Sequence, residues 1–250
     1  MPSSMPSSNR QSVLIIGASG GVGQAVVRSF LQKGEDAIAL HVHSDFSKGE
    51  EIIRSLQAVG RKAVLFQADL VDSVSVSQMF NDLKTSWGRL DILINAAGIV
   101  DDSLFPRLNE TGWDRIVQTN LTGAFYCMRE AGRLMQVQGG GHILNLSSLS
   151  AFTGRVGQAA YTASKRGLIA LTLSAAREWG NDAIQVNAVL PGFLETPMVT
   201  RLSVGQKGKI VKENLLGHSS TLEEVADFIF HLSKMKNVSG QVFNLDSRVF

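Results

Sequence analysis

The chain has 250 residues, of which 44% are hydrophobic, and its formal net charge is +2. A chain of this length can bury one sizeable core, and α/β sheets of this size often form one domain. The small positive charge, without a basic run, gives no indication of nucleic-acid binding. The single cysteine, Cys127, excludes an internal disulfide and fits a reducing cytoplasm.

The first ten residues, MPSSMPSSNR, are rich in serine and proline and lack the apolar stretch of a signal peptide. We therefore expect a disordered tail at 1–10 and a single domain at 11–250. The longest apolar runs are far shorter than the ~20 residues that a membrane span requires. We expect no membrane partner and a cytoplasmic location.

Short apolar runs alternate with longer amphipathic runs along the rest of the chain. Strands are expected at 12–17, 37–42, 63–68, 90–95, 142–147, 184–190 and 241–245, and helices at 21–33, 47–59, 73–87, 112–137, 157–179 and 221–234. The strand runs do not alternate with polar residues, which indicates a parallel sheet buried on both faces. Repeated strand–helix–strand units predict a doubly wound α/β fold of about seven strands. The longest irregular stretch, 192–220, is interpreted as a lid.

The first expected strand runs into GASGGVG, in which Gly17, Gly21 and Gly23 have G-x-x-x-G-x-G spacing. At the first strand–helix turn of such a sheet, backbone N–H groups and the positive end of the helix favour a pyrophosphate. Glycine is needed where a Cβ would block close approach or where φ is positive. The alternative is a turn that only connects strand to helix, but the position of the motif favours dinucleotide binding.

The end of the second expected strand bears on which dinucleotide binds. NAD enzymes usually place an acid there, which accepts a hydrogen bond from a ribose 2′-hydroxyl. This chain has His41 and His43 in that region, and Asp45 lies a little further on. A 2′-phosphate is then not repelled, and His43 or Lys48 could contact it, so NADP(H) is favoured over NAD(H). Gly20 stands where an arginine could have held the phosphate, and both histidines could instead be solvated residues at a strand end.

The stretch QAAYTASKRG (158–167) places Tyr161 and Lys165 four positions apart, on one face of a helix. A free tyrosine has a pKa of ~10, and a nearby ammonium group favours its phenolate. Lowering that pKa to around 7 needs roughly 4 kcal/mol. A lysine, an oxidised nicotinamide ring and a partly dry site could supply this together. Taken alone, the pattern is more typical of an amphipathic face with a snorkelling lysine.

Other polar and small residues gather where the expected strands end. The fifth strand ends in NLSS, so the hydroxyls of Ser147 and Ser148 could hold a substrate carbonyl or else cap a loop. The fourth ends in NAAG (95–98), against which a cofactor can lie, and PGFLET (191–196) follows the sixth. Asn120 is a poor helix former within 112–137 and should be exposed or bonded to something specific. Because ligands of open α/β sheets bind at this edge, the combination favours a catalytic pair.

On these residues the sequence resembles the short-chain dehydrogenase/reductases with the single-domain Rossmann fold, from about residue 12 to 246. The resemblance implies a catalytic tetrad of Asn120, Ser148, Tyr161 and Lys165. Ser148 is preferred to Ser147 because the family serine lies thirteen residues before the tyrosine. The resemblance also implies cofactor contacts and no metal; these contacts are Gly17, Ser19, Gly21, Val22, Gly23, His43, Asp69, Leu70, Asn95, Ala96, Gly98, Tyr161, Lys165, Pro191, Gly192 and Thr196.

The same resemblance implies a role for each tetrad residue. Tyr161 exchanges a proton with the substrate oxygen, and Ser148 bonds and orients that oxygen. Lys165 lowers the tyrosine pKa and holds the nicotinamide ribose, while Asn120 anchors a water that relays protons to Lys165. The cofactor carries the hydride chemistry.

Within the family, GQAAYTASKRGL and VNAVLPGFLETPM are most similar to the 3-oxoacyl-[acyl-carrier-protein] reductases. This similarity implies that NADPH reduces a 3-oxoacyl thioester, on acyl carrier protein or CoA, to the 3-hydroxyacyl form in fatty acid biosynthesis. The chain ends in LDSRVF, where the family usually has an aspartate followed by two glycines. Gly139 and Asp182 stand near positions where the subgroup often has basic residues that dock the carrier protein. These departures concern the carrier-protein substrate rather than the chemistry.

Two alternatives stay open. The same chemistry could act on a sugar, a steroid or a small alcohol, or the chain could be a non-catalytic scaffold subunit on this fold. The resemblance also implies a homotetramer or homodimer. Phe125, Ala170 and Leu173 could form its apolar outer face or instead pack against the sheet.

Overall fold

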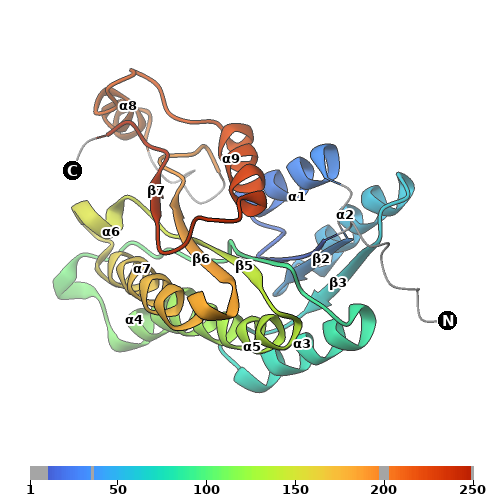
Figure 1. Ribbon diagram of the computed structural model, residues 1–250. Coiled ribbons are helices and arrows are strands. Elements are labelled where there is room, and N and C mark those ends of the chain that lie inside the picture. Colours follow the sequence, from blue (N-terminus) through green and yellow to red (C-terminus); the bar gives the residue numbers. More distant parts are fainter. Residues whose placement is uncertain (1–10, 35–36, 197–202, 249–250) are drawn as a thin grey trace.

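The computed structural model describes residues 11–34, 37–196 and 203–248, and within them seven parallel strands form one sheet (Figure 1). The strands are β1 Ser12–Ile16, β2 Ala37–Val42, β3 Ala63–Gln67, β4 Ile92–Asn95, β5 Gly141–Leu146, β6 Ile184–Leu190 and β7 Val242–Asn244. Their order in the sheet is β3-β2-β1-β4-β5-β6-β7. The predicted doubly wound α/β fold is therefore confirmed.

Helices cover both faces of this sheet (Figure 1). They are α1 Gly21–Lys33, α2 Phe46–Ala58, α3 Ser73–Trp87, α4 Glu110–Val117, α5 Gly123–Gln138, α6 Ser150–Thr153, α7 Ala159–Trp179, α8 Val204–Lys212 and α9 Leu222–Lys234, with short η helices at Phe105–Arg107, Gln118–Thr122 and Gly180–Asp182. Helices α1, α2 and α9 pack on one face, and α3, α5 and α7 pack on the other.

The hydrophobic pattern of the sequence explains these layers. All residues of β1 and β2 are buried, as strands covered on both faces must be. In α9, the buried residues Val225, Ala226, Ile229 and Phe230 recur at helical spacing. The ring of Phe230 meets that of Phe30 of α1 edge to face, with 5.0 Å between centroids.

Three elements differ from their predicted form. The expected helix at 112–137 is α4 and α5 joined by the π-helical turn Gln118–Thr122. The strand expected at 90–95 begins at Ile92, and the preceding Asp91 carboxylate accepts the N–H of Ser12 at 2.7 Å. The stretch at 192–220 is not wholly irregular, since it contains α8, which Ser203 begins with a capping box.

Some predictions lie beyond what the fold tests. The expected tail at 1–10 lies outside the described residues, and the single-domain boundary stays a prediction. Across the described part of the chain, no helix is long and apolar enough to cross a membrane. Within that same part, no group of three His, Cys, Asp or Glu residues is placed to hold a metal ion.

Candidate active site

Two glycines of the turn after β1, Gly17 and Gly23, are packed too closely to carry a side chain. At Gly17, where φ is +77°, an added Cβ would lie 2.7 Å from the Cα of Ala97. At Gly23, an added Cβ would lie 2.3 Å from the carbonyl oxygen of Gly17. Gly20 is the N-cap of α1 and provides no side-chain acceptor, so no cap side chain covers the first N–H groups of the helix. A turn of this form suits an anionic pyrophosphate.

The two histidines at the end of β2 have different environments. His41 is buried, with Nδ1 accepting from the Gly17 N–H at 3.3 Å and Nε2 donating to the Ala68 carbonyl at 3.0 Å. Burial lowers the pKa of His41 to about 4, so this imidazole is neutral and braces the turn. The side chain of His43 is exposed, and its Nε2 lies 3.8 Å from the Asp69 carboxylate.

Asn120 lies in the π-helical turn and is buried. Its Oδ1 accepts the N–H of Ile99 at 2.8 Å, and its Nδ2 donates to the Ile99 carbonyl at 2.9 Å and to Ser164 Oγ at 3.3 Å. This confirms that a poor helix former at this position is bonded to specific partners. The widened turn directs the amide at the segment that follows β4.

Lys165 is also buried, although its residue type is nearly always exposed. Its Nζ donates to the Leu146 carbonyl at 2.8 Å and lies 5.9 Å from the centroid of the Tyr161 ring. An added Cβ on Gly98 would be 3.1 Å from this Nζ, so the small residue leaves room for the lysine. Burial lowers the pKa of Lys165 to about 8.

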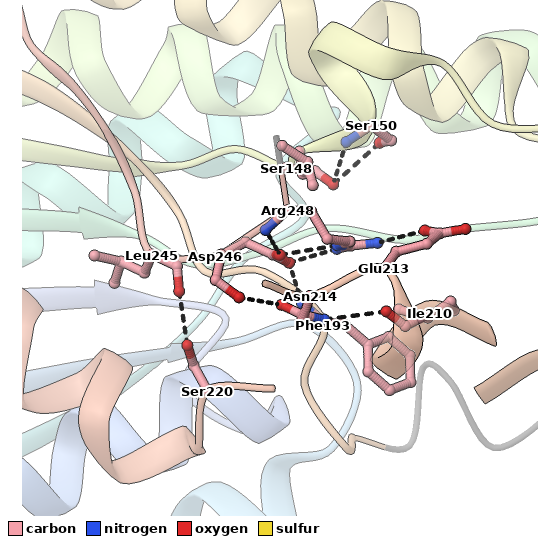
Figure 2. A network of polar contacts seen from close by, with 12 residues as sticks. Ser148, Ser150, Phe193, Ile210, Glu213, Asn214, Ser220, Leu245, Asp246 and Arg248 are labelled. Atoms are coloured by element: carbon pink, nitrogen blue, oxygen red, sulfur yellow. Dashed lines mark hydrogen bonds and ion pairs between the residues drawn. The ribbon is translucent and has the colours of Figure 1, made fainter. Parts of the chain in front are cut away.

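Ser148 and Ser147 use their hydroxyl groups differently. Ser147 Oγ donates to the Lys165 carbonyl at 2.8 Å, so its proton is already engaged. Ser148 Oγ accepts two bonds from Ser150, from the hydroxyl at 3.0 Å and from the N–H at 3.3 Å (Figure 2). A hydroxyl has one proton and two acceptor sites. Ser148 is therefore left with its proton to donate, either to the Tyr161 oxygen beside it or to a carbonyl oxygen.

The phenol of Tyr161 is held in its protonated form. Burial raises its pKa, while the hydrogen bond with Ser148 and the positive charge of Arg155 act in the opposite direction. In this structure the penalty for burying a phenolate outweighs these two influences. The expected lowering of the tyrosine pKa by Lys165 together with an oxidised nicotinamide ring stays a prediction.

A cavity of about 950 Å³ opens at the carboxyl edge of the sheet. The predicted site residues that line it are Val22, Ala96, Gly98, Ser148, Tyr161, Lys165, Pro191, Gly192 and Thr196. Those outside its lining are Gly17, Ser19, Gly21, Gly23, His43, Asp69, Leu70, Asn95 and Asn120. The Asn95 amide instead donates to Asn145 Oδ1 at 2.8 Å, within the sheet.

Two groups of residues at this cavity were not found from the sequence. Ser150, which bonds Ser148, follows the predicted strand end, but no motif marked it. The other group belongs to the unusual ending LDSRVF, and Figure 2 shows its contacts. The buried Asp246 carboxylate accepts the N–H of Phe193 at 3.1 Å and pairs with the Arg248 guanidinium. Ser247 Oγ donates to Asn214 Oδ1 at 3.0 Å, just beyond α8.

The family description "short chain dehydrogenase" matches residues 11–207. The chain belongs to this family. It is therefore an oxidoreductase, and its relatives' chemistry requires a nicotinamide cofactor. The cavity fits such a group, because it extends from Val22 at the glycine turn to Ser148 and Tyr161.

Individual relatives cover nearly the whole chain. A 3-oxoacyl-[acyl-carrier-protein] reductase FabG of Staphylococcus aureus is 34% identical over 242 residues, which are 96% of this chain and 98% of that protein. A FabG of Thermotoga maritima is 34% identical over 237 residues, which are 93% and 95% of the two chains. A crystal structure of a Sinorhizobium meliloti protein is similar with a TM-score of 0.90 at 28% identity, covering 97% of this chain and 96% of that one.

Proposed function

We propose that this dehydrogenase reduces a 3-oxoacyl thioester, carried by acyl carrier protein or CoA, to the 3-hydroxyacyl form with NADPH, in fatty acid biosynthesis. The observation that carries the proposal is the single cavity that joins Ser148, Tyr161 and Lys165 to Val22 of the glycine turn. The FabG relatives support the substrate, since that reaction gives them their name.

In the proposed reaction, a bound nicotinamide cofactor would be the source of the hydride that reduces the carbonyl carbon. Tyr161 is protonated and gives its proton to the carbonyl oxygen, on which negative charge develops. Ser148 donates a hydrogen bond to the same oxygen and positions it. Lys165, whose Nζ is anchored on the Leu146 carbonyl, binds the nicotinamide ribose. Asn120 keeps the segment after β4 in place and anchors a proton-relaying water.

The preference for NADP(H) is supported at the end of β2. The Asp45 carboxylate accepts the N–H of Lys48 at 3.3 Å as the N-cap of α2, so it is engaged within the chain. The side chain of His43 is exposed, with its Nε2 3.8 Å from the Asp69 carboxylate, so a 2′-phosphate can reach it from solvent. We therefore propose His43 as a phosphate contact, and replacing it with alanine should narrow the difference in KM between NADPH and NADH.

An activity panel tests the proposed function directly. Purified protein is incubated with acetoacetyl-CoA, acetoacetyl carrier protein and simple ketones, each with NADPH and with NADH, and the absorbance of the reduced cofactor is followed. We expect turnover of the acetoacetyl thioesters with NADPH. If only sugars, steroids or small ketones are reduced, the thioester substrate is wrong and the family chemistry is retained.

The oligomeric state is a further proposal. Phe125, Ala170 and Leu173 are exposed, so they do not pack against the sheet as the alternative required. They give α5 and α7 an apolar outer face, which supports a homotetramer or homodimer. A cytoplasmic location and docking of acyl carrier protein are proposed on the likeness to FabG.

A further inference from the structure

Three cationic side chains line the cavity of about 950 Å³, and they differ in how their charges are balanced. Lys165 is buried and its Nζ donates to the Leu146 carbonyl at 2.8 Å. Arg248 donates from Nε to Asp246 Oδ1 at 2.8 Å, pairs with the second oxygen of that carboxylate, and lies 4.0 Å from Glu213 (Figure 2). Two carboxylates therefore already compensate Arg248.

Arg155 is the third cation, and no carboxylate among the described residues balances its charge. It is exposed on the cavity wall and forms no ion pair with any residue in the described ranges. Asp102 lines the same cavity, but its carboxylate accepts the Gln158 amide at 2.9 Å rather than Arg155. The guanidinium keeps its donors free for a ligand.

The backbone that carries Arg155 is fixed. The Gln158 N–H donates to the Arg155 carbonyl at 3.0 Å, and the Ser103 N–H donates to the Gly157 carbonyl at 2.8 Å. Helix α7 begins directly after this turn, at Ala159, and its N-cap Gln158 makes no side-chain capping bond. The partial positive charge of that helix end adds to the charge of Arg155.

We propose that Arg155 recognises an anionic group, a carboxylate or a phosphate, on the carbonyl substrate. This rests on the proposed function for the carbonyl, which Ser148 and Tyr161 hold in the same cavity. The charge of Arg155 is felt at Tyr161, where it opposes the rise in pKa, so the cation is electrostatically coupled to the reacting end of the cavity. Arginine is suited to this task because its planar fork binds carboxylate and phosphate with two parallel bonds.

Matched substrates test the proposal and separate the two sources of charge. Acetoacetyl-CoA carries phosphates, whereas acetoacetyl-N-acetylcysteamine is a neutral thioester. Acetoacetate carries a carboxylate, whereas methyl acetoacetate is neutral. For the charged member of one pair, Arg155→Gln should raise KM at least about tenfold, as expected for the loss of one charge-assisted bond. For the neutral member of that pair, KM should change less than about twofold. Arg155→Lys should restore part of the affinity.

Arg107→Gln is the matched control, since Arg107 is also exposed but lies outside the cavity lining, on the short helix Phe105–Arg107. The proposal is overturned if Arg155→Gln leaves every KM unchanged, raises KM equally for both members of each pair, or has the same effect as Arg107→Gln.

If the protein reduces acetoacetate but neither thioester, the proposed function is contradicted, and the acetoacetate pair still tests Arg155. If neither pair is reduced, fluorescence titration with CoA, and with 3-hydroxybutyrate against its methyl ester, measures the same selectivity. Equal affinity of wild type and Arg155→Gln for both anions would then overturn the proposal.

Discussion

At Ser148, two bonds from a neighbour decide what the hydroxyl can do. Ser150 bonds both acceptor sites of Ser148 Oγ, so the Ser148 proton is left to donate to Tyr161 or to a bound carbonyl oxygen. Ser150 is thus a positioning residue in the proposed reaction, acting through Ser148. No motif pointed to it, because its effect depends on a turn that brings two hydroxyls to 3.0 Å.

We expect Ser150→Ala to lower kcat about three- to tenfold with little change in KM, since about 1 kcal/mol of hydrogen bonding that orients Ser148 is lost. Ser150→Thr should recover most of the rate. Ser55→Ala is the control, because the Ser55 hydroxyl donates to the Ile52 carbonyl of its own helix, α2, away from the cavity lining. An unchanged kcat in Ser150→Ala would contradict the assigned role.

The proton donor is tested at Tyr161. Replacing it with phenylalanine keeps the ring and removes the hydroxyl, so cofactor binding should survive while turnover falls by orders of magnitude. Stopped-flow or steady-state kinetics measure turnover, and titration of cofactor fluorescence measures cofactor binding. Activity equal to wild type would exclude Tyr161 as the donor.

Among the elements, those defined by a continuous apolar pattern agree with prediction and those shaped by a tertiary contact do not. The bounds of α1, α3, β2 and β6 are as expected from the sequence. The break between α4 and α5 was not predicted, because the hydrophobic period continues across it and only the bonds of Asn120 to Ile99 reveal the wider turn. Helix α8 was missed because Gly205 and Gly208 are poor helix formers.

The packing of α5 against α7 makes an element-scale prediction. A Cβ on Gly132 of α5 would lie 2.7 Å from Cζ2 of Trp179 at the end of α7. The rigid indole has little freedom to move aside, so Gly132→Ala should lower the free energy of unfolding by about 1–3 kcal/mol. Urea denaturation measures this change.

Gly208→Ala is the matched control in a helix, because no heavy atom lies within 4 Å of the added Cβ. There the gain in helix propensity should leave stability unchanged or raise it by up to about 1 kcal/mol. If the two substitutions change the free energy of unfolding equally, the close contact with Trp179 does not destabilise Gly132→Ala, and the prediction is wrong.

For the molecule as a whole, two buried histidines predict sensitivity to acid. Burial lowers the pKa of both His41 and His142 to about 4, below the ordinary value of 6.5. Between these values the unfolded chain binds protons that the folded chain does not, so stability is complete above about pH 6.5 and is lost as the pH falls towards 4. At pH 5 the loss should be about 2 kcal/mol for each histidine.

Urea denaturation at pH 7.5 and pH 5 measures this dependence. His41→Asn should reduce by about half the difference in the free energy of unfolding between pH 7.5 and pH 5, because one of the two protonation sites is removed. His231→Gln changes an exposed histidine and should leave the difference as it is in wild type. A wild-type protein equally stable at both pH values would contradict the prediction.

The sequence by itself determined the parallel sheet and the family, because apolar runs, glycine spacing and the Tyr161–Lys165 pair are local patterns. The residues of the tetrad are a prediction from the family resemblance. Only the tertiary structure decided which groups are free to act. It showed that Ser148 accepts two bonds from Ser150, that burial raises the pKa of Tyr161, and that carboxylates among the described residues pair with Arg248 but not with Arg155. Burial and pairing depend on residues far apart in the chain, and no local pattern records them.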